Sequence, residues 1–178
     1  MGQTLVIAEK PSVAGDIARA LGGFKKDGDF WVSDAMIVGS AVGHLLEIKA
    51  PEEYDVKRGR WSFANLPVLP PHFDLQRIKK CIKKFEGLEK KIRSRSVTDI
   101  INACDAGREG ELIFRYIIQA TGTKKPIRRL WLQSMTKASI QKAFTALRSD
   151  AEMKPLEAAA RSRSEADWLV GINGTRAL

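Results

Sequence analysis

The sequence has few of the residues that build zinc sites and covalent cross-links, with two cysteines and two histidines among 178 residues. Cys81 and Cys104 lie far apart and show neither CxxC spacing nor a histidine pattern typical of zinc binding, so a zinc module of that kind is excluded. Such sparing use of cysteine is typical of a reduced chain, and we therefore predict a cytoplasmic protein.

The sequence also lacks a long apolar run near its start. The first residues, MGQTLVIAEKPS, contain only a short apolar stretch bounded by charge, which fits neither a signal peptide nor a membrane span. The sixth position holds Val6 instead of serine or threonine, so N-myristoylation is not supported. We expect no membrane partner.

Acidic residues are outnumbered, at 21 against 30 lysines and arginines, which gives a formal net charge of +9. This excess favours a polyanionic partner, nucleic acid before membrane, although a basic protein without such a partner has the same composition. Nine of these cations lie between Arg77 and Arg95 and surround an apolar face with helical spacing, so they form either a solvated surface or a nucleic-acid contact. The apolar positions of that face are Ile78, Ile82, Phe85, Leu88 and Ile92.

Units of a strand followed by a helix recur along the chain. Residues 4–8 form a short apolar run, Pro11 suits the first position of a helix, and Gly22 and Gly23 are expected to end that helix. Residues 97–104 form a second apolar run, and helical spacing returns after the acidic loop that follows. The pattern predicts an α/β layer with a mainly parallel sheet flanked by helices. The inward positions of the second helix are Leu112, Ile113, Tyr116, Ile117 and Ala120.

The remaining segments are less regular. Residues 30–41 are typical of two short strands and residues 129–132 of another, whereas residues 49–73 are rich in proline and charge and predict an irregular excursion over the surface. Thr136 is expected to cap a helix that buries Ile140, Phe144 and Leu147.

The composition changes near residue 150. A polar stretch is followed by an alanine-rich segment that predicts a helix to about Val170, and GINGTRAL comes after it. We therefore predict one domain over residues 1–150 and the start of an α-helical second domain over residues 151–178.

Acidic and basic residues gather where the two apolar strands are expected to end. Glu9 and Lys10 follow the first strand, and ACDAGREGE, residues 103–111, follows the second, so both would lie at one edge of a parallel sheet. Asp105 and Glu109 could supply oxygens to Mg²⁺, which prefers a few carboxylates and retains several waters. Lys10 and Arg108 add the positive charge that phosphoryl transfer requires. The alternative is an acidic start of a helix, favoured by the helix dipole alone.

Four motifs in this order resemble bacterial DNA topoisomerase III, a type IA DNA topoisomerase. They are LVIAEKPSVAGDIARAL, AVGHLLEI, ACDAGREGELIFRY and ARSRSEADWLVGINGTRAL, and together they extend over residues 4–178. The resemblance implies an N-terminal fragment of such an enzyme, whose main part is a Toprim domain, a Rossmann-like layer.

The resemblance also implies roles for the charged residues. Glu9 matches the catalytic acid-base glutamate, and Lys10 the lysine that supports the scissile phosphate. The family's acidic motif is usually DxDxE, whereas here the middle position is Gly107. One carboxylate is thus missing. Mg²⁺ is therefore expected to bind Asp105 together with either Glu109 or Glu111, and Glu9 is expected to contribute to the same metal site.

The last motif resembles the entry to a domain that binds single-stranded DNA. On this match four residues are expected to contact phosphates or bases, and Trp61, preceded by a run of cations, is a candidate for base stacking or for a core anchor. From the residues alone, Arg161 and Arg163 would be ordinary helix surface. The four residues are Arg161, Arg163, Asn173 and Arg176.

Type IA enzymes cleave DNA with a tyrosine, and this sequence has only Tyr54 and Tyr116, neither in the family's nucleophile motif. The expectation is a monomeric fragment that carries the acid-base and metal half of the site, needs the rest of its polypeptide, and does not relax DNA alone. Two alternatives stay open: a stand-alone Toprim nuclease or primase-like enzyme, in which a metal-bound water replaces tyrosine, and a non-catalytic DNA-binding module.

Overall fold

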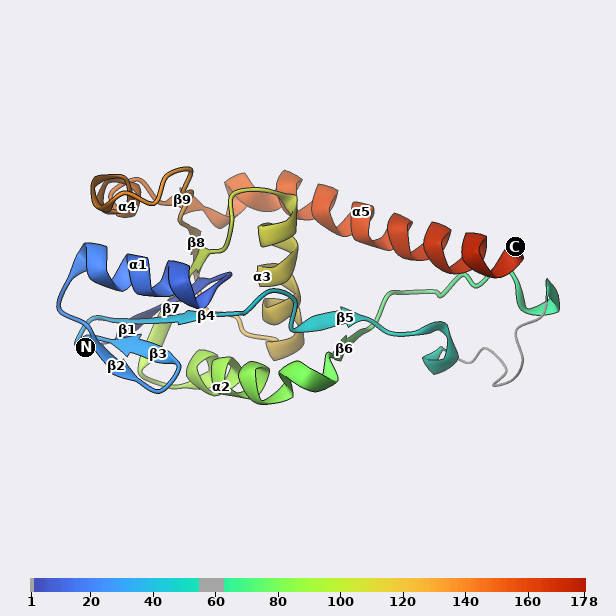
Figure 1. Cartoon of the computed structure of the whole chain (residues 1–178), viewed down its shortest axis with the longest axis horizontal. Coiled ribbons are helices and arrows are strands. Elements are labelled where there is room, and N and C mark those ends of the chain that lie inside the picture. The colour runs from blue at the N-terminus through green and yellow to red at the C-terminus, as the bar shows by residue number, and fades with distance from the viewer. Residues whose placement is uncertain (1, 55–62) are drawn as a thin grey trace.

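A mixed, mainly parallel sheet forms the centre of the protein (Figure 1). The coordinates are a computed structural model, and the structure describes residues 2–54 and 63–178. The four central strands of the sheet are parallel, and the edge strands join them antiparallel, which confirms the predicted α/β sheet. From edge to edge the strands are β2 (Lys25–Asp27), β3 (Phe30–Val32), β4 (Met36–Ser40), β1 (Gln3–Ala8), β7 (Val97–Ala103), β8 (Ile127–Arg129) and β9 (Arg148–Ser149).

One face of the sheet is covered by α1 (Pro11–Leu21) and α4 (Lys137–Phe144). Pro11 stands at the start of α1 and Gly22 closes it, as predicted. The side chain of Thr136 accepts a hydrogen bond from the Ser139 amide, which confirms the predicted cap of α4. The side chains that bury this face include Val6, Ala14, Ile17, Val38, Ile101 and Ile140.

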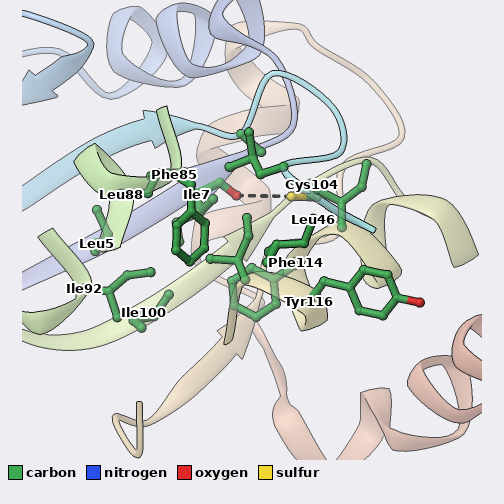
Figure 2. Close-up of a cluster of buried hydrophobic side chains, with 14 of the residues drawn as sticks. Leu5, Ile7, Leu46, Phe85, Leu88, Ile92, Ile100, Cys104, Phe114 and Tyr116 are labelled. Atoms are coloured by element: carbon green, nitrogen blue, oxygen red, sulfur yellow. Dashed lines mark hydrogen bonds between the residues drawn. The ribbon is translucent and has the colours of Figure 1, made fainter. Parts of the chain in front are cut away.

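The other face is covered by α2 (Ile82–Arg93) and α3 (Arg108–Thr121), whose apolar side chains pack on those of β1 and β7 (Figure 2). Leu5 and Ile7 point into this cluster, whereas Val6 and Ala8 belong to the opposite one. The central strand β1 is therefore buried on both sides, which explains why its sequence is an unbroken apolar run instead of an alternating one.

Five predictions about these elements were inaccurate. The parallel strand β8 is Ile127–Arg129, earlier than the predicted residues 129–132, and Arg129 at its end is buried. Ile82 opens α2 but is 37% exposed, so the buried face begins at Phe85. Ala120 is exposed near the end of α3. Ile78 and Leu147, both predicted on helix faces, lie outside α2 and α4. The sequence located these elements but not their ends.

A small second sheet pairs β5 (Leu46–Ile48) with β6 (Leu75–Arg77). The chain between these strands is irregular where it is described, with 3-10 turns at Pro51–Glu53 and Phe63–Asn65, as predicted for the excursion. Figure 1 shows this segment lying beside the C-terminal part of α5 (Asp150–Ala177).

Helix α5 is longer than predicted. It begins at a capping box in which Ser149 accepts from the Glu152 amide and the Glu152 carboxylate accepts from the Ser149 amide, and it continues past Val170 to Ala177. Gly171 and Gly174, which follow the predicted end of the helix, are helical. The first part of α5 packs on α3, with Ala160 in the core, so tertiary contacts override the weak local helix propensity. None of the helices in the described ranges is long and apolar enough to cross a membrane.

Candidate active site

The ends of β1 and β7 meet as the sequence predicted. The strands are parallel and in register through the pair Ala8–Ala103, so Glu9 and the loop that starts at Cys104 leave the sheet side by side. The Glu9 carbonyl accepts from the Val42 amide at 2.7 Å, which ties the turn after β4 to the same edge. The convergence of Glu9 and the acidic loop is therefore confirmed.

Glu9, Lys10 and Asp105 form a compact charged cluster. Lys10 Nζ lies 3.4 Å from Asp105 Oδ2 and 4.0 Å from Glu9 Oε1. The Glu9 side chain is 12% exposed and Asp105 51%. Burial, helped by the nearby negative charge of Asp105, raises the pKa of Glu9, whereas Lys10 and the Asp105 amide oppose this shift. A raised pKa favours the protonated form of a carboxyl group, which a general acid needs.

Two glycines shape the acidic loop. Gly107 has φ +156° and ψ 179°, a backbone conformation that L side chains rarely adopt. A Cβ on Gly110 would overlap the backbone of Asp105, because the first turn of α3 packs directly against the loop. The middle aspartate of DxDxE is thus replaced here by a glycine that the local backbone requires.

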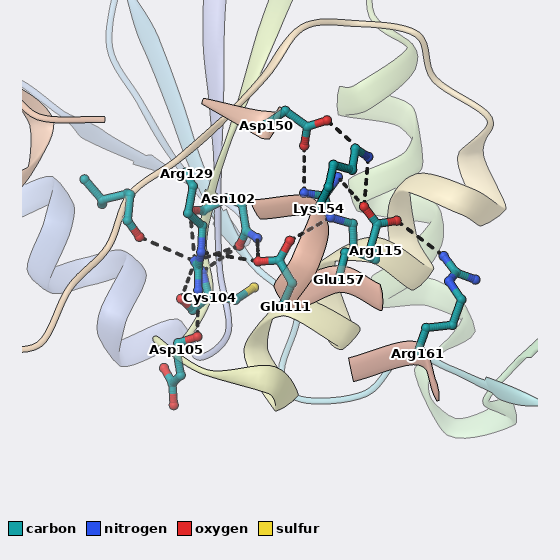
Figure 3. Close-up of polar contacts among 11 residues, drawn as sticks. Asn102, Cys104, Asp105, Glu111, Arg115, Arg129, Asp150, Lys154, Glu157 and Arg161 are labelled. Carbon is teal, nitrogen blue, oxygen red and sulfur yellow. Dashed lines mark hydrogen bonds and ion pairs between the residues drawn. The ribbon is translucent and has the colours of Figure 1, made fainter. Parts of the chain in front are cut away.

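A buried arginine donates hydrogen bonds to the backbone of the acidic loop. Arg129 is 1% exposed and lies at the end of β8 (Figure 3). Its Nη1 donates to the Cys104 carbonyl at 2.6 Å and to Asn102 Oδ1 at 3.0 Å, and its Nη2 donates to the Asp105 carbonyl at 2.7 Å. Since these acceptors belong to β7 and the loop, Arg129 fixes the backbone on which Asp105 stands. The sequence reasoning missed Arg129 because it lay inside a segment read only as a strand.

The structure does not bring Glu111 to the open edge. Its side chain is fully buried, and its Oε1 accepts from Arg115 Nε at 2.7 Å. The other oxygen accepts from Asn102 Nδ2 at 3.1 Å and lies 3.4 Å from Arg129 Nε. Both oxygens are therefore occupied by protein groups. Glu111 and Arg115 are four residues apart on α3, and this i, i+4 spacing was the signal that could have indicated an internal ion pair.

This buried network extends to α5. Arg115 Nη2 lies 2.6 Å from Asp150 Oδ1, and Arg115 Nη1 lies 3.4 Å from Glu157 Oε2. Burial alone would lower the pKa of Arg115, but hydrogen bonds to Asp150 and Glu111 and the nearby carboxylates together raise it. Burial alone would raise the pKa of Asp150, but the hydrogen bonds and positive charges of Arg115 and Lys154 together lower it. The network thus connects the acidic loop, α3 and the first turn of α5.

A cavity of about 570 Å³ opens between the acidic loop and α5. Its lining includes Asp105, Arg108 and Glu109 on one side and Arg163 and Asp167 on the other. Glu109 is 70% exposed and contacts Nε2 of His44, which also lines the cavity. The open edge of the sheet therefore faces a groove that carries both signs of charge.

Comparison with known protein families identifies the domain that contains this site. The sequence profile of the Toprim domain matches residues 4–135. The chain belongs to the Toprim family.

The Toprim chain is similar over its whole length to bacterial topoisomerases. It is 46% identical over 176 residues to DNA topoisomerase 3 of Staphylococcus aureus (strain USA300), covering 99% of this chain and 25% of the relative. It is 44% identical over 178 residues to DNA topoisomerase 3 of Bacillus subtilis (strain 168), covering 100% and 24%. These similarities confirm the resemblance to topoisomerase III found in the four motifs, and the chain spans about a quarter of the length of these curated relatives.

A solved structure supports the fold. The full-length topoisomerase I of Thermotoga maritima superposes with a TM-score of 0.50 at 22% identity, covering 82% of this chain and 21% of that one. This comparison confirms the Rossmann-like arrangement of the Toprim domain.

The carboxylates of the Toprim edge fit Mg²⁺ with water as the remaining ligand. Asp105 and Glu9 are close enough for the charge of Asp105 to raise the pKa of Glu9, and Glu109 lines the same cavity as Asp105. Within residues 2–54 and 63–178, no group of three or more His, Cys, Asp or Glu side chains is close enough to hold a metal by itself. One or two carboxylates plus waters is the usual ligand set of Mg²⁺ at phosphate sites.

The residues predicted to bind DNA lie in different settings. Arg163 lines the cavity, although its Nε is 2.7 Å from Asp167 Oδ2, and Arg161 donates to Gln119 Oε1 at 2.7 Å. Asn173 is used inside the domain, because it accepts from the Val68 amide at 2.6 Å and donates to the Val68 carbonyl at 3.1 Å. Arg176 lies 3.1 Å from Glu52, and Trp61 lies outside the described residues.

Proposed function

We propose that this Toprim domain supplies the acid-base and Mg²⁺-binding half of a type IA DNA topoisomerase III that cleaves and rejoins single-stranded DNA. The observation that carries the proposal is the cluster of Glu9, Lys10 and Asp105 at the adjoining ends of β1 and β7, with 3.4 Å between Lys10 Nζ and Asp105 Oδ2. The similarity to DNA topoisomerase 3 over the whole chain supports the choice of reaction.

Each residue of the cluster has a distinct role in this proposal. Glu9, whose pKa is raised, moves a proton to and from the oxygen of the leaving group. Lys10 and Arg108 stabilise the negative charge that develops on the phosphate oxygens. Asp105, assisted by Glu109 and Glu9, would hold Mg²⁺, and the bound ion would supply Lewis-acid stabilisation of the phosphate. Glu111 is left out of this set, because its oxygens accept hydrogen bonds from Asn102 and Arg115 and lie within ion-pair distance of Arg129.

The cavity beside the cluster is the proposed path of the DNA strand. Arg163 on α5 and Arg108 at the start of α3 line it from two elements, so a phosphate backbone passing between them would reach Asp105. Arg161 would contact the same strand farther along α5. Asn173 and Arg176 would act indirectly, by holding the excursion against α5.

The nucleophile is expected elsewhere in the polypeptide. Both tyrosines of this chain are used structurally: Tyr116 shares a hydrogen bond with Ser164 at 2.9 Å, and the Tyr54 hydroxyl accepts from the Asp74 amide at 2.8 Å. We propose further that residues 151–178 lead into the next domain, and that the enzyme works as a cytoplasmic monomer.

Relaxation of negatively supercoiled plasmid tests the proposal. The polypeptide that contains this sequence together with its remaining domains should relax the plasmid with Mg²⁺. Glu9→Gln should abolish this activity, and the matched control Asp167→Asn, on the other wall of the cavity, should retain it. The 178-residue chain alone should not relax DNA. Relaxation that survives in Glu9→Gln would overturn the proposal, and Mg²⁺-dependent nicking by the chain alone that Glu9→Ala abolishes would favour a nuclease.

A further inference from the structure

The outward surface of α2 carries a run of lysines that the proposed active site does not use. At about 100° per residue, Lys83, Gly87 and Lys90 share one side of the helix, opposite the buried Phe85 and Leu88. Three further lysines extend this side, Lys79 and Lys80 in the 3-10 turn before α2 and Lys91 near its end. Lys79, Lys80, Lys83, Lys90 and Lys91 are called the α2 lysine face below.

The acids near this face are occupied by other cations. Glu89 accepts from Arg93 at 2.9 Å and from Arg77 at 3.1 Å, and Glu86 lies 3.8 Å from Arg77. Among the residues that the structure describes, no carboxylate lies within ion-pair distance of Lys79, Lys80, Lys83 or Lys90. Four of the five lysines are therefore not neutralised by a carboxylate of the domain, and Lys91 lies over the Phe30 ring, with its Nζ 5.2 Å from the ring centroid.

Gly87 lies in the middle of this face, three or four residues from Lys83, Lys84, Lys90 and Lys91. A Cβ on Gly87 would meet no atom within 4 Å, so packing does not require glycine here. A glycine inside a helix costs about 0.5–1 kcal/mol relative to alanine. The absent side chain leaves a shallow place between lysines, where an anionic group can approach the helix backbone.

We propose that the α2 lysine face is a second DNA contact, which binds the phosphate backbone of duplex DNA. Its length from Lys79 to Lys91 is about 18 Å at 1.5 Å per residue, enough to span several phosphates. The neighbouring aromatic side chains Phe30 and Phe85 are buried, so the face offers phosphate contacts without a stacking platform for unpaired bases.

The choice of DNA as the polyanion rests on the proposed topoisomerase function. A membrane fits less well, because insertion requires apolar side chains beside the cations, and Ile82 alone among the buried-face positions of α2 reaches 37% exposure. Figure 1 shows α2 and α5 on opposite sides of the molecule, so a duplex bound on α2 would leave the groove beside α5 accessible.

Binding of a short labelled duplex to the whole chain, followed by fluorescence anisotropy over a range of salt concentrations in EDTA, tests the proposal. Lys83→Gln/Lys90→Gln should reduce the magnitude of the slope of log K against log salt by up to about 2, since each phosphate contact contributes about 0.9. Lys137→Gln/Lys142→Gln on α4 removes the same charge from the other face of the sheet and should leave the slope nearly unchanged. Gly87→Glu should also weaken binding, and its open Cβ position lets the fold persist.

Equal slopes for the two double variants would overturn the proposal, and so would lysine-dependent binding to phosphatidylserine vesicles without binding to duplex. The outcome is separable from the proposed active site. Binding is measured in EDTA, and neither double variant touches the cluster of Glu9, Lys10 and Asp105, so the result does not depend on whether that cluster performs catalysis.

Discussion

The acidic segment from Asp105 to Glu111, which runs from the loop after β7 into the first turn of α3, contains two regions that differ in burial and in role. At its start, Asp105 is 51% exposed and lines the cavity. Lys10 lies within ion-pair distance of both Asp105 and Glu9. Six residues later, Glu111 is fully buried between Arg115 and Arg129. Carboxylates thus form an exposed cluster at the start of this segment and a buried ion-pair network at its end.

The difference shows that the buried network determines the geometry of the cluster. Arg129 connects the two regions, because it contacts the Glu111 carboxylate and donates to the carbonyls of Cys104 and Asp105. A charge buried in this way is costly unless it is paired, so the network imposes one arrangement on the loop. The exposed cluster can then exchange protons or ions without loss of the fold.

Among the substitutions that test this difference, Glu111→Gln is expected to lower the stability most. The substitution leaves Arg115 and Arg129 buried without their shared carboxylate, and breaking a buried pair costs about 3–5 kcal/mol. The midpoint of thermal unfolding should fall by about 10 °C. Glu109→Gln, in the exposed part of the loop, should change it little. A Glu111→Gln protein as stable as Glu109→Gln would refute the role of the buried network.

Gly110→Ala should have the next largest effect, because its Cβ would overlap the backbone of Asp105. Overpacking of this kind costs about 1–3 kcal/mol and would displace the loop. Gly87→Ala is the matched control: its Cβ lies in open space on another helix, so stability should rise by about 0.5–1 kcal/mol. Urea unfolding measures both, and a shift of the same sign in both variants would contradict the account.

Gly107→Asp restores the carboxylate that the family motif usually has at this position. Its backbone conformation at φ +156° disfavours a side chain, so we expect a loss of about 1–2 kcal/mol in the free energy of unfolding. The denaturation midpoint should therefore fall at an unchanged m-value. An equally stable variant would show that the loop adopts another conformation in solution.

Glu9→Gln should have the smallest effect on stability, and one that depends on pH. The pKa of Glu9 is raised above 4.5 in the folded protein, chiefly by burial, so the folded state binds more protons than the unfolded state as the pH rises above that value. Ionised Glu9 therefore opposes folding at neutral pH. Glu9→Gln should unfold at a slightly higher temperature than the wild type near neutral pH, and the difference should vanish below pH 4.5. A difference that grows on acidification would contradict the shift.

The sequence predicted the parts of the fold that follow from hydrophobic periodicity. The runs around β1 and β7, Pro11 at the start of α1 and the Thr136 cap all led to the observed elements, and the parallel pairing then brought Glu9 to Asp105. What could not be predicted depends on tertiary contacts. Glu109 and Glu111 look alike in sequence, but one faces the cavity and the other the interior.

Helix α5 and Arg129 illustrate the same limit. Pro155, Gly171 and Gly174 argue locally against a continuous helix, and packing on α3 together with the bonds of Asn173 to Val68 outweighs them. Arg129 was hidden inside a strand, because a single cation in a sequence carries no information about the carbonyls that surround it.

The most direct test of the central claim is a calorimetric Mg²⁺ titration of the folded chain and its Asp105→Asn variant, with Asp167→Asn as the control from the same cavity. We predict that Asp105→Asn weakens Mg²⁺ binding at least about tenfold, or 1.4 kcal/mol, without lowering the unfolding temperature, and that Asp167→Asn binds as the wild type does. Equal Mg²⁺ affinity in Asp105→Asn and the wild type would contradict the assignment of the open cluster as the metal site.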